Sequence, residues 1–573
     1  MQDSAFIPPL RIGLVLDSCF GSKYVYDLVD WVQTEKKVEV TQLLIKTCPC
    51  PRDTRRDRLL TWLRDAFFSV LSSVEDFFAK KVLGSDDHYR KFDINKVVPH
   101  KVLISAHSEE FVNYPFEEDV KKVQALKLDL IVNCASALLG GPILSASRLG
   151  VISCQYGDNP ASIGAPAGFW EVYERKQATN FTIRRLATEP EKSFVLRKGA
   201  VPTKYLFGLT RAILYKKSTF FLKQLVSQIV DTGVLPRPLQ SYPCPSKLSS
   251  KPTLLKQFAY LLKTGATISE KAVNYFFIKK EFWWSVCFQR VPWNQLNMSQ
   301  AIKIENPPGY FLADPFVLRE GNKDYCFVEE FNSSTNRGHI TAYRLHADYA
   351  ERLGEIIVEP FHMSFPYVFR FGGKLYICPE TNENNDIRLY ECEQFPTEWK
   401  LSKILMSGFS AVDTMIFQHG GLWWLFTNID SASIGDYSGE LHIFYSQDPV
   451  NGAWTPHPHN PIQSGSLKAR NGGLIVNGEG LFRISQERGF EIYGRGFSIN
   501  KIITLTTEEY VEKEEFSTGE DFFPNIIGAH HLHSSGDLTV FDCQEWKRRT
   551  QKRLGTEETV VKELKHWPSP VNL

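Results

Sequence analysis

One strand–turn–strand pattern recurs along the C-terminal half of the sequence and constrains the fold more than any other feature. In its first copy the apolar segment Leu312–Leu318 is followed by a glycine turn and a second apolar segment, Tyr325–Glu330. The copies are 51, 48, 59 and 58 residues apart when they are aligned on five equivalent positions: Asp314, Phe365, Asp413, Gly472 and His530. A two-strand unit that repeats about every 50 residues is typical of a β-propeller blade. Five copies predict a five-bladed propeller.

The two ends of the repeat indicate how the ring closes. The fifth copy has no clear outer strand after Asp542, whereas the apolar segment Trp283–Gln289 precedes the first copy without belonging to it. We expect this segment to pair with the last blade, because such closure removes the exposed edges of a sheet.

The residues before the propeller follow a different pattern. Short apolar runs such as Leu10–Leu16 and Leu128–Asn133 alternate with segments of helical periodicity, which favours a parallel, doubly wound α/β sheet. A chain of 573 residues is also too long for a single core. The predicted organisation is a Rossmann-like α/β domain over residues 1–214, a helical bridge over 215–280, the propeller over 281–550 and a C-terminal tail over 551–573.

Part of the first domain resembles the formyltransferase fold of methionyl-tRNA and sugar N-formyltransferases. The resemblance rests on the order of five segments: Asp129–Asn133, Gly150–Tyr156, Gly164–Trp170, Thr182–Leu186 and Glu191–Leu196. Active members of that family have Asn-x-His after the Gly-Val-Ile segment and an Asp in a later loop. In this sequence the three positions are Ser153, Gln155 and Glu191. A glutamine amide does not titrate near neutral pH, so the resemblance implies a retained fold with a degenerate site.

Composition argues against several classes of function. The formal net charge of +1 gives no electrostatic reason to expect nucleic acid as a partner. The N-terminus lacks the basic and apolar regions of a signal peptide, and no run of about 18 apolar residues occurs, so we expect no membrane span. The 11 cysteines have no metal-site spacing, which favours reduced thiols in a cytoplasmic protein. Nothing in the sequence sets the oligomeric state.

The propeller fold predicts where a site would form, because the first strand of every blade lines the central funnel. We expect the starts of these strands to meet the ends of the second strands, which are also polar: Glu329, Glu330, Glu380, Asn428, Gln486 and Asp542. Our catalytic candidates are Asp314 as base or nucleophile, Glu380 as general acid and Asp413 as orienter. Our substrate-binding candidates are Arg470, Asn471, His530, His531 and Glu330.

Two alternatives for these residues stay open. An aspartate at the start of an inner strand can simply cap a turn through backbone N–H groups. The histidines His530, His531 and His533 could bind a metal together with the acids, but we expect substrate contact and no metal.

The propeller has two family resemblances. Ala313–Phe316 and Asp413 resemble the first-blade aspartate motif and the supporting aspartate of the glycoside hydrolase clan that contains arabinanases, invertases and levansucrases. A further resemblance, to the accessory propeller of plant glucosamine inositolphosphorylceramide transferases, is carried by four segments: Ser364–Phe369, Pro379–Thr381, Ala411–Asp413 and Tyr493–Gly494. In those plant proteins a separate domain is assigned the transferase chemistry.

Three hypotheses for function follow. The first is a cytoplasmic transferase or hydrolase that acts on a sugar or sugar-phosphate conjugate in the propeller funnel, in glycan or glycoconjugate biosynthesis. The second is a formyl- or acyl-group transferase that uses the N-terminal domain and keeps the propeller for recognition. The third is a binding protein without catalysis. The residues require no cofactor, although the resemblances allow 10-formyltetrahydrofolate or a sugar nucleotide.

Overall fold

The computed structural model describes residues 8–47, 55–83, 90–109, 112–157, 166–188, 193–239, 252–278, 280–518 and 527–548. The chain forms two units, Met1–Ser269 and Glu270–Leu573.

The first unit is built on a mixed nine-stranded sheet with the order β11-β10-β9-β7-β1-β3-β5-β6-β8. The strands are β1 (Leu10–Leu16), β3 (Val38–Thr47), β5 (Lys101–Glu109), β6 (Val112–Pro115), β7 (Leu130–Asn133), β8 (Leu138–Leu139), β9 (Val151–Tyr156), β10 (Ala178–Arg185) and β11 (Phe194–Pro202). The five central strands from β5 to β9 are parallel to one another, whereas the neighbouring pairs β9–β10, β10–β11 and β5–β6 are antiparallel.

The expected wholly parallel sheet is therefore corrected to a mixed one. A short connection joins β10 directly to β11, and only antiparallel strands can be joined without a crossover. Membership of the formyltransferase fold stays a prediction.

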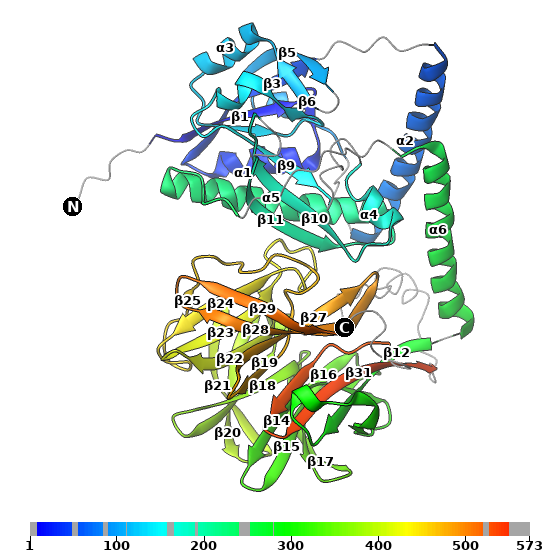
Figure 1. Ribbon diagram of the computed structural model, residues 1–573, viewed down its shortest axis with the longest axis vertical. Helices are drawn as coiled ribbons and strands as arrows, with labels where there is room; N and C mark the ends of the chain where they lie inside the picture. The colour runs from blue at the N-terminus through cyan, green and yellow to red at the C-terminus, as the bar shows by residue number, and fades with distance from the viewer. Residues whose placement is uncertain are drawn as a thin grey trace, which may run out of the picture. The chain divides into compact units, whose positions relative to one another are not determined.

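Six α-helices belong to this part of the described chain: α1 (Lys23–Thr34), α2 (Arg55–Leu83), α3 (Glu117–Ala125), α4 (Phe169–Tyr173), α5 (Phe207–Thr232) and α6 (Leu254–Val273). Helix α5 packs against β10, β11, α1 and α2, so the first part of the expected 215–280 bridge lies against the sheet (Figure 1). Among the described residues, none of the helices has both the length and the apolar content that a bilayer span requires.

The second unit is a five-bladed β-propeller made of five four-stranded sheets (Figure 1). Blade 1 contains β14 (Tyr310–Glu320), β15 (Lys323–Asn332), β16 (Arg337–Leu345) and β17 (Ala350–Ile357). Blade 2 contains β18 (Ser364–Phe371), β19 (Lys374–Glu380), β20 (Asp386–Gln394) and β21 (Glu398–Ser407). Blade 3 contains β22 (Ala411–His419), β23 (Leu422–Ile429), β24 (Leu441–Ser446) and β25 (Thr455–Pro456). Blade 4 contains β26 (Asn471–Asn477), β27 (Gly480–Gly489), β28 (Ile492–Leu505) and β29 (Tyr510–Ser517).

The fifth blade closes the ring as the sequence predicted. Its strands follow the order β30 (Leu532–Ser535), β31 (Leu538–Arg548), β12 (Lys280–Gln289) and β13 (Ile302–Lys303). Strand β12 pairs with β31 over its whole length, from Lys280 opposite Arg548 to Gln289 opposite Thr539. The five-bladed propeller and its closure by the Trp283 segment are confirmed.

Candidate active site

The inner strands of the first four blades share one irregularity at one register. In each, pairing with the second strand skips two residues, which follow Ala313 in β14, Ser364 in β18, Val412 in β22 and Asn471 in β26. The first skipped residues of blades 1 to 3 have left-handed backbones, with φ of 49° at Asp314, 46° at Phe365 and 51° at Asp413. Bulges of this kind redirect side chains and are frequent beside active sites. The alignment of these positions read from the repeat is confirmed by the sheet register.

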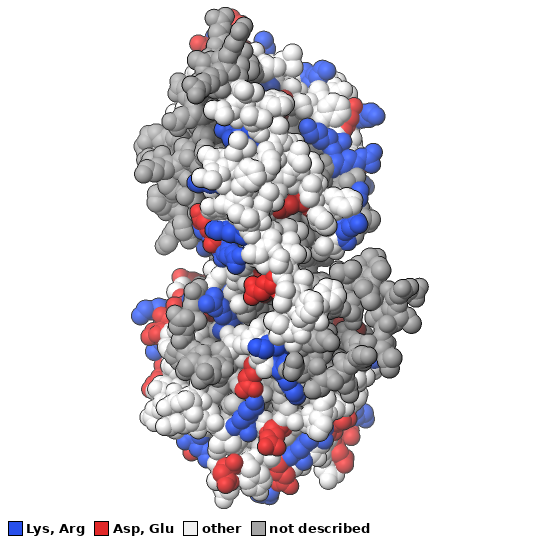
Figure 2. Space-filling model, turned by 90° about the vertical axis from the view of Figure 1, so that its right-hand side faces the viewer, with Lys and Arg blue, Asp and Glu red and all other residues white. Residues whose placement is uncertain are grey.

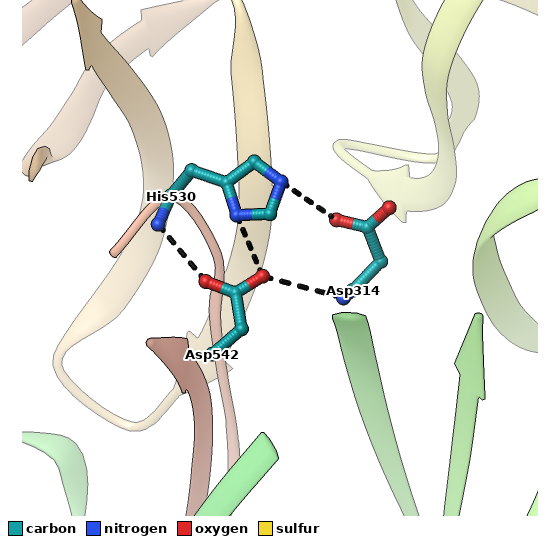
Figure 3. A group of neighbouring side chains, drawn as sticks. All are labelled: Asp314, His530 and Asp542. Atoms are coloured by element: carbon teal, nitrogen blue, oxygen red, sulfur yellow. Dashed lines mark hydrogen bonds and ion pairs between the residues drawn. The ribbon is translucent and has the colours of Figure 1, made fainter. Parts of the chain in front are cut away.

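Three buried groups from the first and last blades form one cluster (Figure 3). The imidazole of His530 lies between two carboxylates, with its Nδ1 2.6 Å from Asp542 Oδ2 and its Nε2 3.5 Å from Asp314 Oδ1. The Asp542 carboxylate also accepts hydrogen bonds from the backbone N–H groups of Asp314 (3.3 Å), His530 (2.9 Å) and His531 (3.0 Å). Asp542 is therefore the acid that caps the turn. The Asp314 side chain does not have this capping role.

The two aspartates of this cluster have opposite protonation tendencies. Burial raises the pKa of Asp314 to about 7; the adjacent His530 opposes this rise, and the charges of Asp413 and Asp542 add to it. Burial also acts on Asp542, but the neighbouring His530 outweighs it and lowers the pKa of Asp542. Burial works against a charge on His530, yet the Asp542 carboxylate raises the pKa of that imidazole. Asp542 and His530 thus form an ion pair beside an aspartate that titrates near neutral pH.

A second cluster joins blades 2, 3 and 4 around the guanidinium of Arg470. Its Nε donates to Asp413 Oδ2 at 2.6 Å, and its terminal nitrogen lies 3.9 Å from Glu380 Oε2. Gln486 Nε2 donates to the same Asp413 oxygen at 3.0 Å. Asp413 is thereby held by side chains, as an orienting acid would be.

Glu380 and Glu329 are the buried acids most disposed to keep a proton. Burial raises the pKa of Glu380 well above its usual range, with the Asp413 charge adding to the rise and Arg470 opposing it. Burial and the charge of Asp314 raise the pKa of Glu329 in the same direction. A carboxylic acid kept neutral in this way can act as a general acid.

The Tyr493 ring links the two clusters, and the Trp284 ring packs beside it. The Tyr493 ring lies 5.3 Å from the His530 ring, and the guanidinium of Arg470 lies 5.1 Å above the same tyrosine. Trp284, from the closing strand, is 4.0 Å from the His530 ring. A Cβ at Gly494 would come within 2.6 Å of the Trp284 ring, so this glycine allows the close approach. The two clusters therefore share one wall.

The remaining candidates have other surroundings. Asn471 supports the bulge, since its backbone N–H donates to Asn428 Oδ1 at 2.8 Å and its Nδ2 donates to the Asp413 carbonyl at 2.9 Å. His531 packs edge-on against Phe316, and burial lowers its pKa to about 3.

Glu330 is set apart from both clusters. Its Oε1 forms an ion pair with Arg352 at 2.6 Å and lies 3.4 Å from His339. Burial opposes its charge, but these two partners lower the pKa of Glu330 to about 2. It is a paired carboxylate between the second and outer strands of blade 1.

Residues 294–521 match the family model described as the N-terminal part of glucosamine inositolphosphorylceramide transferase 1. The transferase of that name from Arabidopsis thaliana is 39% identical over 212 residues, which is 36% of this chain and 27% of the plant protein. Its counterpart from Oryza sativa subsp. japonica is 36% identical over 250 residues, 41% of this chain and 33% of that protein. The chain thus spans a third or less of these curated relatives. The predicted resemblance to the plant propeller is confirmed.

Similar solved structures include glycoside hydrolases. One is Zg3597, a family 117 glycoside hydrolase of Zobellia galactanivorans, with 10% identity, a TM-score of 0.31 and coverage of 46% of this chain and 90% of that one. Another is an exo-1,5-α-L-arabinanase from a bovine ruminal metagenomic library, with 11% identity, a TM-score of 0.30 and coverage of 44% and 98%. Scores this low carry no argument about activity.

Several residues of the two clusters are not among the catalytic or substrate-binding candidates that the sequence predicts. Asp542, Gln486 and Glu329 were visible as polar ends of second strands, which was the signal that could have identified them. Trp284 and Tyr493 lie on outer strands of their blades, and no pattern in the repeat indicates that their rings reach the inner strands.

The degenerate formyltransferase positions lie at the end of β9. Ser153 is buried, and its hydroxyl is 3.5 Å from the Asn133 side-chain nitrogen. Gln155 is half-buried opposite Thr182 of β10. Glu191 lies outside the described residues.

The first cluster has a composition that can also hold a cation. Asp314, His530 and Asp542 each offer a ligand atom within 4.8 Å of the others. A metal requires a free imidazole nitrogen, whereas each nitrogen of His530 faces a carboxylate and its pKa is raised. The arrangement thus fits a protonated histidine between two acids better than it fits a metal site.

Proposed function

We propose that this protein is a carbohydrate-directed enzyme and that its chemistry occurs between the two acid clusters of the propeller. The single observation that supports this proposal is the difference in protonation among buried acids of adjacent blades. Burial raises the pKa of Glu380 well above its usual range, whereas the pKa of Asp314 rises only to about 7. Glycosyl chemistry needs such a set, because one acid must give a proton while another accepts one or attacks carbon.

In the mechanism we propose, Glu380 protonates the leaving oxygen of the sugar. Asp314 acts as base or nucleophile, since a pKa of about 7 matches proton transfer near neutral pH. Asp413 and Arg470 orient Glu380, and the His530–Asp542 pair holds the charge next to Asp314. Transfer and hydrolysis differ only in the acceptor, which is the hydroxyl group of another molecule in transfer and water in hydrolysis.

Hydrogen-bonding capacity in both clusters supports a polar ligand. Asp314 Oδ1 and Glu380 Oε2 are buried side-chain oxygens without a hydrogen-bond partner. A buried acceptor left unsatisfied costs about 1–3 kcal/mol, and a sugar hydroxyl would relieve this cost. The names of the matched plant relatives also favour glycoconjugate biosynthesis, with a sugar or sugar-phosphate substrate and a sugar nucleotide as one candidate donor.

The proposal is tested first by binding and then by turnover. A saturation-transfer NMR screen of monosaccharides, inositol phosphates and sugar nucleotides should identify ligands of the full chain. Glycosyl transfer or hydrolysis of those ligands, followed by mass spectrometry, should fall at least about 100-fold in Glu380→Gln and Asp314→Asn.

A matched control is available in blade 1. Asp324 is a buried carboxylate of β15 that pairs with Arg290 and Arg319 at 2.7 Å, outside both clusters. Asp324→Asn should therefore retain activity in proportion to its folded fraction. Full activity in both Glu380→Gln and Asp314→Asn would reject the proposal.

A further inference from the structure

Helix α6 is amphipathic, but it buries polar side chains and exposes apolar ones. Its buried side chains include the polar residues Gln257, Tyr260 and Thr264, while Leu255 and Leu262 are 80% and 76% exposed. A helix on the surface of a globular unit normally does the opposite and buries its apolar face. Some other environment must therefore suit the outward face of α6.

Helix α2, which packs beside α6, has the same reversal. Its Glu75 is buried and accepts hydrogen bonds from the backbone N–H of Gly208 (2.8 Å) and from the Tyr260 hydroxyl. Its Trp62 is 64% exposed. The two helices are joined by Gln257 Nε2, which donates to the Arg64 carbonyl at 3.2 Å. Their outward faces are therefore parts of one surface.

We define the α2/α6 face as the exposed side chains of residues 59–82 and 255–269. Nine large apolar side chains are exposed in the first range and five in the second. Figure 2 shows a broad area without charge on this side of the molecule, with lysines, arginines and some acidic residues near its margins. Apolar patches of this extent mark binding surfaces in folded proteins.

The charges of the α2/α6 face are predominantly positive. Lys81, Lys256 and Lys263 are exposed, and each ammonium lies over an aromatic ring at 4.7, 4.6 and 4.2 Å. Among the acids of residues 59–82, Asp76 pairs with Arg211, Glu75 is buried, and Asp65 pairs with the neighbouring Arg64 at 3.0 Å. Long lysine side chains can lie along apolar rings and still place their ammonium groups among anions.

We propose that the α2/α6 face binds the surface of an anionic lipid bilayer, with both helices lying in the interface. Exposed Trp, Phe and Leu flanked by lysine are the features of interfacial helices, and each lysine near an anionic leaflet adds attraction. A second copy of the chain is a poorer occupant, because its lysines would repel those of the first. The proposal is independent of the chemistry in the propeller.

The test is vesicle flotation of the full chain. The protein should float with vesicles of phosphatidylcholine containing about 30% phosphatidylserine, bind phosphatidylcholine alone more weakly, and dissociate from the mixed vesicles as salt rises. The double variant Trp62→Asp/Leu262→Asp should lose at least tenfold in binding. Its thermal midpoint should be unchanged, because both side chains are exposed in the free protein.

Two further variants separate the causes. Leu103→Asp/Val234→Asp changes two other exposed apolar residues of the same unit, outside both helices, and should bind as the wild type does. Lys81→Glu/Lys256→Glu keeps the apolar side chains and should lose binding only to the anionic vesicles.

Three results would overturn the proposal. One is no flotation of the wild type with either vesicle, and another is unchanged flotation of the Trp62→Asp/Leu262→Asp variant. The third is a wild-type dimer in light scattering that this variant converts to monomer, since the face would then be a contact between copies.

Discussion

Asp314 and Asp542 face the same imidazole, yet their surroundings give them opposite contributions to stability. Asp542 accepts three backbone N–H bonds and pairs with His530, so its charge is satisfied. Asp314 Oδ1 has no hydrogen bond, so burial makes its charge unfavourable. A raised pKa in the folded state means that the folded protein binds more protons than the unfolded chain, and stability then falls as pH rises.

The variant Asp314→Asn tests this assignment. Between the ordinary pKa of 3.8 and the folded value of about 7, Asp314 should lower the free energy of unfolding by up to about 1.4 kcal/mol per pH unit. Asparagine removes that slope and tolerates the left-handed backbone, so the variant should be as stable as the wild type below about pH 3.5, where both states bind the proton, and increasingly more stable as pH rises towards 8. Urea unfolding at four pH values across this window measures it, and identical slopes in the two proteins would contradict the assignment.

Asp542→Asn is the matched control and should act in the opposite direction. The lowered pKa of Asp542 means that its charge stabilises the fold above its ordinary pKa, and that this stability is lost as pH falls through the folded pKa. At pH 7 the variant should lose about 3 kcal/mol, since it leaves His530 beside a neutral group.

At the scale of strands, the sequence predicts which strands pair better than it predicts which side of a strand faces the acid clusters. The period of the repeat gives the blades, and the unpaired Trp283 segment gives the closure, because both depend on apolar patterns. Glu329 and Glu330 show the limit. Neighbouring residues on a strand face opposite sides, but which side faces the acid clusters depends on a register that the pattern does not reveal. The bulges, which set that register, leave little trace in sequence beyond Asp-Pro and Gly-Gly.

The bulge in β26 allows a prediction at this scale. A Cβ at Gly472 would lie 2.4 Å from the backbone oxygen of His530, and a backbone atom cannot move aside as a flexible side chain can. Gly472→Ala should therefore cost about 3 kcal/mol or more and displace His530 from its two acids. Thermal unfolding measures the first effect.

Gly478→Ala is the control for this substitution. The glycine lies between β26 and β27, and a Cβ there would meet nothing within 4 Å. The same change of side chain should leave the unfolding midpoint within a degree or two. Equal losses at both glycines would show that the close approach of β26 to His530 does not constrain the fold.

At the scale of the whole molecule, the propeller depends on a strand that comes before its first repeat. Trp284, Val286 and Phe288 of β12 are buried, and β12 covers the edge of β31 along ten residues. Without β12 the last blade would keep only its two inner strands and would expose Val540 and Phe541. Trp284 would also be lost from the wall of the acid clusters. Strand β12 is therefore needed both to complete the last blade and to form the candidate site.

Two shortened chains test the closure directly. Residues 270–548 contain all five blades and should unfold in one cooperative thermal transition, whereas residues 291–548 lack β12 and should show no cooperative transition. A synthetic peptide of residues 280–290 supplies β12, so adding it to the shorter chain, which already contains β13, should restore the transition in proportion to peptide concentration. The same peptide with Val286 and Phe288 changed to aspartate should fail, because both side chains are fully buried. A cooperative transition in residues 291–548 alone would mean that the ring closes without its preceding strand.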